Sequence, residues 1–277
     1  MKIMNKVKRI VVGDIHGRYD IFKKIYDKEQ PENPNEVFYN VMILGDYFDT
    51  HEDISSDDQL RSFLDLRTLQ EKHLKTTGEF VMLVGNHDFH YIVDDQRYSG
   101  YSNYTNCIVS QHLKNALKEH KLKFAEVDYH NRTIYSHAGI TNTWINDRHN
   151  KNFDLSLINV DSYDKFKFVY GKRLDPYGDD PMNGPLWVRP NSLISDMYKS
   201  LDEDINTVTT WTQIVGHTSC KKPIIAHEDG SQWKEGEDWR FAKFWDIDCL
   251  KNGYYMVEWF DDDMTIISRE IKKMEEN

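Results

Sequence analysis

Five short, largely apolar runs, each followed by polar residues close to a glycine, set the pattern of this sequence. Uncharged runs such as 41–44 and 80–84 are typical of strands buried on both faces of a sheet. Segments with apolar residues at helical spacing lie between the first strands, at 19–30, 57–75 and 106–121. The alternation of strand and helix predicts an α/β protein with a parallel sheet. The predicted strands are 8–12, 41–44, 80–84, 133–136 and 213–215.

The pattern changes in the second half of the chain. From 140 to 212 it is irregular, with a helix predicted over 162–170 and a loop rich in Pro, Gly and Asp over 175–185. Long excursions of this kind usually form binding loops or a cap. We therefore expect one domain, residues 1–277, with 140–212 as a cap-like insertion. Antiparallel strands are predicted near the end, at 222–227, 244–247, 254–260 and 264–269.

Composition narrows the possible functions. The 277 residues carry a formal charge of −11, from 35 basic and 46 acidic residues. This charge makes nucleic acid an unlikely partner, since the phosphate backbone attracts basic proteins. No apolar run approaches the ~18 residues that span a bilayer, and the first residues lack the apolar core of a signal peptide. We expect a cytoplasmic protein without a membrane partner. The three cysteines, which form no CxxC pair, are interpreted as ordinary buried thiols.

The polar residues at the strand ends are candidate metal ligands. Asp14, Asp46 and Asn86 each follow a glycine directly after a strand, and His16 and His87 lie next to them. Because parallel strands end at the same edge of a sheet, we expect these side chains to converge. Mixed oxygen and nitrogen ligands suit Mn, Fe or Zn better than Ca. For each motif alone, a turn with local hydrogen bonds is the alternative.

Two further segments carry candidate substrate contacts. The loop 98–104, with Tyr101 at its centre, is either a wall of the substrate cleft or a packed surface loop. Arg189 follows the apolar residues 186–188 and suits a phosphate fork, with a surface salt bridge as the alternative.

Taken in order, the five motifs resemble those of the calcineurin-like metallophosphoesterases, and among them the phosphoprotein phosphatase branch. The matching signatures are GDxHG at 13–17, GDxxD at 45–49, GNH[ED] at 85–88, HxG at 137–139 and GH at 216–217. The resemblance implies an α/β fold in which two mixed β-sheets pack as a sandwich flanked by helices. It also implies a dinuclear metal site at the carboxyl ends of the strands.

Carried over to this chain, the resemblance implies six metal ligands. The first ion would be held by Asp14, His16 and Asp46. The second would be held by Asp46, Asn86, His137 and His217, with Asp46 bridging the ions. We expect two divalent or trivalent ions, with Mn²⁺ favoured and Fe, Zn or Ni as alternatives.

The resemblance also implies the catalytic roles. A water bridging the two ions would be the nucleophile. His87 would protonate the leaving oxygen, Asp49 would orient the His87 ring, and Arg189 would hold the phosphate. The predicted substrate-binding residues are Arg189, Asn86, Arg18 and Tyr101.

Two departures from the phosphatase pattern leave the substrate open. Thr50 stands where GDxxD normally continues with a phosphate-clamping Arg, and Ser219 stands where many metallophosphoesterases have a second His. We expect hydrolysis of phosphomonoesters, with a phosphoprotein or a small phosphate ester as substrate. The enzymatic alternatives are a hydrolase of dinucleoside polyphosphates or cyclic nucleotides and, disfavoured by charge, a nucleic-acid end-processing enzyme. A non-catalytic scaffold of the same fold is the alternative from another class.

Overall fold

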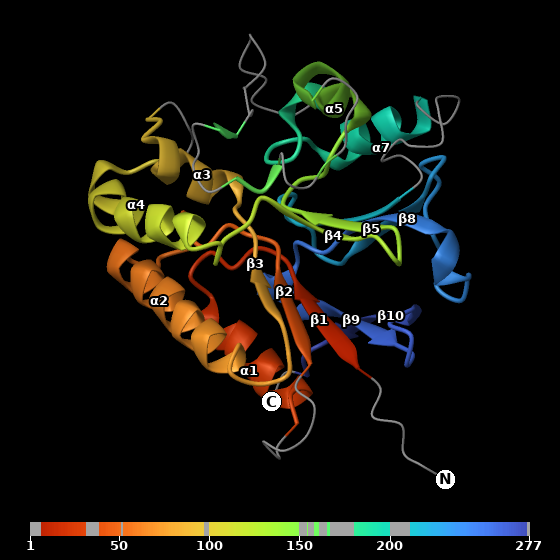
Figure 1. Cartoon of the computed structure of the whole chain (residues 1–277), viewed down its shortest axis with the longest axis horizontal. Helices are drawn as coiled ribbons and strands as arrows, with labels where there is room; N and C mark the ends of the chain where they lie inside the picture. Colours follow the sequence, from red (N-terminus) through yellow and green to blue (C-terminus); the bar gives the residue numbers. More distant parts are fainter. Residues whose placement is uncertain are drawn as a thin grey trace.

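Two β-sheets lie face to face, with helices on their outer sides (Figure 1). Helices α1 (Tyr19–Glu29) and α2 (Ser56–His73) cover one sheet, and α5 (Asn142–His149) and α7 (Pro190–Lys199) lie beyond the other. This arrangement confirms the predicted sandwich. The computed structural model describes residues 7–31, 39–50, 52–96, 100–149, 154, 158–160, 165–166, 180–199 and 211–275.

The first sheet contains the first three predicted strands. Its order is β10 (Ile266–Lys273), β9 (Tyr254–Phe260), β1 (Lys8–Val12), β2 (Asn40–Ile43) and β3 (Phe80–Met82). Strands β1, β2 and β3 are parallel, and β9 runs antiparallel to both β1 and β10. Helices α1 and α2 are the crossover connections that parallel neighbours require. The strand ends that bear Asp14, Asp46 and Asn86 therefore share one edge, as predicted.

The second sheet has the order β4 (Ala125–Asp128), β5 (Thr133–Ser136), β6 (Thr212–Val215), β8 (Ala242–Asp246) and β7 (Ile224–His227). The prediction that 244–247 is an antiparallel strand is only partly right. Strand β8 is antiparallel to β7 but parallel to β6. The chain between β6 and β8 contains β7 and is long enough for a parallel crossover, which the sequence pattern did not reveal.

Alternating side chains of the strands build three apolar layers. Val11 of β1 and Trp245 of β8 are buried between the two sheets. The neighbouring Ile10 packs on the other face of β1, in the cluster that contains Phe22 of α1. On the outer face of the second sheet, residues of β6 and β8 pack against Leu193 of α7. Apolar residues thus pack on both faces of each sheet, which explains the uncharged strands β2, β3, β5 and β6.

Among the described α-helices and strands, four were not predicted from the sequence: α3 (Asn86–Val93), β4, α5 and α7. Strand β4 is short and half charged, and α5 and α7 lie in the stretch expected to be irregular. Helix α4 (Asn103–Lys118) was predicted, three residues further along. The predicted helix at 162–170 and the start of the loop at 175–185 lie mostly outside the described residues. Whether 140–212 acts as a cap stays a prediction.

The structure tests the predictions for the cysteines and for membrane-spanning segments. Cys107 is exposed, Cys220 is partly buried and Cys249 is buried, so the prediction of three buried thiols is wrong for Cys107. Cys107 lies on the solvent side of α4, a helix whose apolar positions are elsewhere. Within the described parts of the chain, no helix is both long enough and apolar enough to cross a membrane.

Candidate active site

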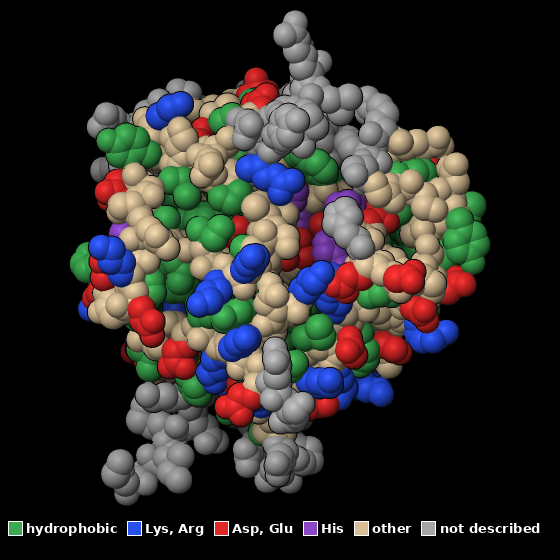
Figure 2. Space-filling model, turned by 180° about the vertical axis from the view of Figure 1, so that it is seen from behind, with side chains coloured by type: hydrophobic (Ala, Val, Ile, Leu, Met, Phe, Trp, Pro, Cys, Tyr) green, Lys and Arg blue, Asp and Glu red, His purple; other side chains and the backbone are tan. Residues whose placement is uncertain are grey.

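Five segments meet where the carboxyl ends of both sheets come together. Asp14 follows β1, Asp46 follows β2, and Asn86 begins α3 just beyond β3. From the second sheet, His137 follows β5 and His217 follows β6. Nδ1 of His137 lies 2.9 Å from the carbonyl oxygen of Leu44, which joins the second sheet to the end of β2. Figure 2 shows histidine and acidic side chains gathered in a hollow on one face of the molecule.

Asp14, His16 and Asp46 form the first group of possible metal ligands. One ligand atom from each lies within 4.8 Å of the others. Nε2 of His16 is 3.8 Å from Oδ2 of Asp14 and 3.8 Å from Oδ2 of Asp46. Nδ1 of the same ring lies 2.7 Å from the carbonyl oxygen of Phe48. Because a carbonyl only accepts, the ring proton is on Nδ1 and the Nε2 lone pair faces the two carboxylates.

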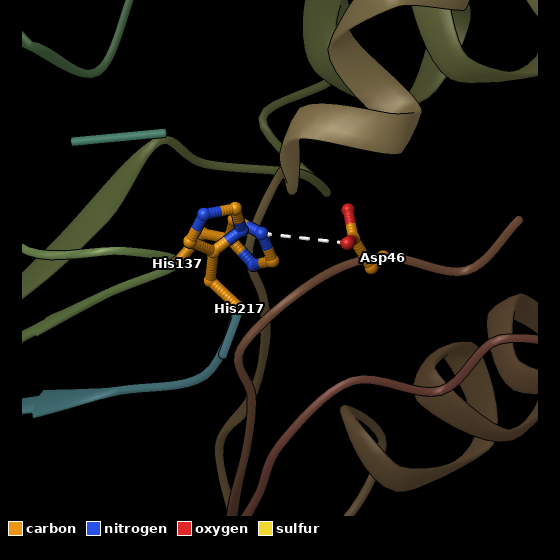
Figure 3. Close-up of side chains that lie close together, drawn as sticks. All are labelled: Asp46, His137 and His217. Carbon is orange, nitrogen blue, oxygen red and sulfur yellow. Dashed lines mark ion pairs between the residues drawn. The ribbon is translucent and has the colours of Figure 1, made fainter. Parts of the chain in front are cut away.

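Asp46, His137 and His217 form the second group, again with ligand atoms within 4.8 Å of one another (Figure 3). Nε2 of His137 is 3.4 Å from Oδ2 of Asp46. Asn86 joins this group through Oδ1, which is 2.8 Å from Nε2 of His137 and 2.9 Å from Nδ1 of His217. The structure thus brings together all six ligands that the resemblance implied, and Asp46 belongs to both groups.

The chemistry of the second group fits a cation. His137 donates from Nδ1 to Leu44, and His217 has Nε2 3.2 Å from the carbonyl oxygen of Trp187. If each ring donates to its carbonyl, the nitrogen that faces Oδ1 of Asn86 has a free lone pair, which a metal ion could accept. Burial lowers the pKa of His137 to about 3 and that of His217 well below its usual value, which keeps both rings neutral. Neutral imidazoles and an amide oxygen pointing at one another suit a bound metal ion.

The pKa values of two buried carboxyl groups, Asp14 and Asp46, also favour a bound metal ion. Burial, followed by the charge of Asp248, raises the pKa of Asp14 well above its usual value. Burial also raises the pKa of Asp46 to about 7. Buried carboxyl groups ionise readily only when a positive charge compensates them. Metal ions at this site would supply that charge.

The local backbone is specialised to aim these side chains. His16, Asp46, Asp49 and His217 all have positive φ, between 44° and 69°. Such strain is often held in place at functional sites. Gly85 is required for a different reason, because a Cβ there would lie 2.0 Å from Oδ1 of Asp46. The missing side chain at Gly85 thus lets α3 begin directly against the Asp46 carboxylate, a candidate metal ligand.

His87 and Asp49 lie beside the two ligand groups. Nδ1 of His87 is 3.1 Å from Oδ2 of Asp49, and the His87 backbone N–H donates to Oδ1 of Asp46 at 2.9 Å. Burial alone would lower the pKa of His87, but the negative charges of Asp46 and Asp49 outweigh burial and raise it. Among the described residues, Nε2 of His87 has no hydrogen-bond partner. His87 is therefore suited to hold a proton at Nε2.

Two residues that contact Asp49 of the Asp49–His87 pair were not predicted from the sequence. Nε2 of His90 lies 2.7 Å from Oδ2 of Asp49, and the hydroxyl of Tyr91 donates to Oδ1 of Asp49 at 2.5 Å. Asp49, His87 and His90 also form a third group of possible metal ligands. The three-residue spacing of His87 and His90 would have placed them on one helix face, had α3 been predicted.

The other predicted substrate-binding residues are placed less directly. Nη1 of Arg189 lies 3.3 Å from the carbonyl oxygen of His217 and 3.2 Å from Oγ1 of Thr218, so Arg189 borders the second ligand group. Nε of Arg18 donates to Glu52 at 3.2 Å. The Tyr101 ring packs against His90, with centroids 5.6 Å apart, and its hydroxyl donates to Asp94. Their contacts with substrate stay predictions.

Thr50, which replaces the expected arginine, faces its own loop. Its Oγ1 accepts a hydrogen bond of 3.0 Å from the backbone N–H of Glu52. Glu52 in turn binds Arg18 and, at 2.6 Å, Lys251. The loop after Asp49 thus places a carboxylate between two cations and offers no arginine of its own.

The fold is that of a phosphoesterase. The model of the calcineurin-like phosphoesterase family matches residues 7–249, and the chain belongs to this family. It is a hydrolase that acts on phosphate esters. A comparison with curated protein sequences finds no match.

Solved structures share the fold. A cold-active protein-tyrosine phosphatase of a psychrophilic Shewanella species is 17% identical, with a TM-score of 0.57, and covers 96% of this chain and 80% of its own. A protein serine/threonine phosphatase from Saccharomyces cerevisiae is 15% identical, with a TM-score of 0.55, and covers 100% of this chain and 82% of its own. At such low identity these likenesses extend to the fold alone.

Proposed function

We propose that this chain is a metal-dependent phosphomonoesterase that uses two metal ions, most simply Mn²⁺, with a phosphoprotein or a small phosphate ester as substrate. The observation that carries the proposal is the convergence of five potential ligand side chains on Asp46, with Oδ1 of Asn86 within 2.9 Å of both histidine rings of the second group. Two bound cations would polarise the phosphoryl group and make water more acidic. The cytoplasmic location expected from the sequence stays a prediction.

The residues of the chain would do the rest. Arg189 binds phosphate oxygens from the side of the second ligand group, where its guanidinium already lies against the His217 backbone. As the bond between phosphorus and the leaving oxygen breaks, Nε2 of His87 gives its proton to that oxygen. Asp49 stays ionised and stabilises the proton on His87 beforehand. Burial would raise the pKa of Asp49, but hydrogen bonds from His87 and His90 outweigh burial and lower it.

The test is metal analysis combined with turnover of p-nitrophenyl phosphate and bis-p-nitrophenyl phosphate, with and without added Mn²⁺. We expect about two metal ions per chain and Mn²⁺-stimulated turnover that favours the monoester. Asp46→Asn, which alters both ligand groups, should lose metal and turnover, whereas Asp262→Asn in the exposed β9–β10 turn should keep both.

Other outcomes would select the alternatives. Preference for the diester, or faster turnover of a dinucleoside polyphosphate than of a phosphopeptide, would favour the nucleotide hydrolase. An intact fold that binds no metal and hydrolyses neither ester would reject the proposal and favour the scaffold.

A further inference from the structure

The Asp49 carboxylate contacts more polar side chains than its pairing with His87 requires. Oδ2 lies 3.1 Å from Nδ1 of His87 and 2.7 Å from Nε2 of His90, while Oδ1 accepts the Tyr91 hydroxyl at 2.5 Å. His90 and Tyr91 are adjacent on α3, one turn beyond His87. Short contacts from a ring and a phenol to one carboxylate leave it little freedom to rotate.

This cluster differs from the two metal-ligand groups nearby. Around Asn86, the atoms that converge are all acceptors, which a cation would reconcile. Around Asp49, a potential donor faces each contacted oxygen: ring nitrogens at Oδ2 and a hydroxyl at Oδ1. Although these residues could also hold a metal ion, protons on the rings and the hydroxyl can balance this carboxylate without one.

The surroundings lock the cluster further. The His90 ring is buried at 1% exposure and meets the Tyr91 ring edge-on, with centroids 4.2 Å apart. A Cβ on Gly100 would lie 3.1 Å from Oδ2 of Asp49, so the chain passes closely over the carboxylate. The Tyr91 hydroxyl also receives the backbone N–H of Ser102 at 3.3 Å. The segment that leads into α4 therefore packs against Asp49 and Tyr91. Asp49 contacts the active site through His87.

We propose that His90 and Tyr91 are positioning residues, which fix the Asp49 carboxylate so that it holds the His87 ring with Nε2 directed at the leaving oxygen. This inference rests on the proposed function, because it assigns the two residues to the general acid of that reaction. Neither residue touches substrate. They act through Asp49 on His87.

A general acid accelerates hydrolysis most when the leaving group is poor. Loss of its positioning should therefore slow esters with poor leaving groups selectively, whereas a general structural defect would slow all esters alike. Tyr91→Phe and His90→Leu should lower kcat for phenyl phosphate by about tenfold, while kcat for 2,4-dinitrophenyl phosphate, whose anion leaves unaided, stays within about twofold. KM should change little for either ester. His90→Gln, whose amide nitrogen can replace Nε2 as donor, should recover most of the loss.

A matched control and a double-mutant cycle complete the kinetic test. Tyr26→Phe removes a buried hydroxyl of α1 that lies 2.8 Å from Nδ1 of His73. This substitution should alter neither rate. In the His87→Asn background, Tyr91→Phe should have no further effect, because the two residues act as a unit. Equal losses with both esters, or losses that multiply in the double variant, would overturn the proposal.

NMR of the histidine rings keeps this test separate from that of the proposed function. In the protein loaded with diamagnetic Zn²⁺, long-range ¹H–¹⁵N spectra should show His87 with a fixed proton on Nδ1, assigned by its absence in His87→Asn. In the double variant Tyr91→Phe/His90→Leu, the proton on Nδ1 of His87 should no longer be fixed, whether or not the protein hydrolyses any ester. An unchanged His87 signal, or one metal ion fewer per chain in His90→Leu, would show that the cluster does not position His87.

Discussion

Nε2 of His137 lies 2.8 Å from Oδ1 of Asn86, while Nδ1 of the same ring lies 2.9 Å from the carbonyl oxygen of Leu44. A neutral ring can donate to only one of these oxygens. Burial lowers the pKa of His137 to about 3, so the ring is not doubly protonated near neutral pH. One close pair of acceptors is therefore left opposed, and a metal ion between them would turn repulsion into ligation.

Metal binding should accordingly stabilise the fold. At a metal concentration of a thousand times Kd, mass action adds about 4 kcal/mol to the free energy of unfolding. For a chain of this size that is roughly 10 °C in Tm. Thermal unfolding with EDTA and with Mn²⁺ measures the shift. His137→Ala should remove much of it and His112→Ala, an exposed residue of α4, none. Equal Tm values in EDTA and Mn²⁺ would contradict the metal site.

Gly85→Ala should damage the site without unfolding the chain. The new Cβ would lie 2.0 Å from Oδ1 and 2.4 Å from the backbone nitrogen of Asp46, so the Asp46 carboxylate must move. Displacement of about 1 Å can cost about a hundredfold in rate. We expect weaker metal binding and at least that loss in kcat/KM. Gly236→Ala is the control, because open space surrounds Gly236 and only its positive φ of 95° makes the substitution costly. Normal metal affinity in Gly85→Ala would exclude this steric account.

Arg189→Lys should weaken phosphate binding but not metal binding. A lysine keeps the charge but loses the planar fork that can contact both the His217 loop and two phosphate oxygens. Hydrogen bonds to charged groups contribute about 1.5–3 kcal/mol, so kcat/KM should fall about tenfold to a hundredfold. Inorganic phosphate should also inhibit less strongly. Arg61→Lys, on the exposed side of α2, provides the comparison. Unchanged inhibition by phosphate would mean that another residue holds it.

The sequence predicted the convergence of the candidate metal ligands better than it predicted their surroundings. Asp14, Asp46 and Asn86 follow buried strands, and the parallel order of those strands alone brings them to one edge. His137 and His217 come from the other sheet, and only the family resemblance joined them to the first three. Their approach depends on packing between sheets, such as the bond from His137 to Leu44, which has no local sequence pattern.

The helix that carries His87 was missed because its signals are unusual. Helix α3 begins at Asn86 itself, and its cap is Gly85, whose backbone N–H donates to Oδ2 of Asp88 at 2.8 Å. Glycine offers no side-chain cap, and eight residues are too few for a clear apolar period. Without the helix, neither the contact of His90 with Asp49 nor the hydrogen bond from Gly85 to Asp88 could be predicted.

The buried ion pairs between the sheets are a separate source of stability. Glu258 of β9 is fully buried and accepts from Arg269 at 2.8 Å, from Arg9 at 3.1 Å and from the Tyr135 hydroxyl of the other sheet at 2.6 Å. Glu258→Ala leaves buried arginine charge without its partner, which costs about 3–5 kcal/mol. Urea unfolding should show this loss, and Glu270→Ala, exposed on β10, should change little. A loss below about 1 kcal/mol would mean that water or Asp128 replaces the missing carboxylate.

His73 should make stability depend on pH, at a distance from the metal site. Its ring, 1% exposed, lies 2.8 Å from the Tyr26 hydroxyl, and burial lowers its pKa from 6.5 to about 4. Between these values the unfolded chain binds the proton and the folded chain does not. This contribution is therefore complete above pH 6.5 and is lost as pH falls towards 4, by up to about 3 kcal/mol. His73→Gln cannot titrate, so the difference in unfolding free energy between variant and parent should shrink across that range. A difference that stays constant from pH 7 to pH 4 would show that His73 keeps an ordinary pKa in the fold.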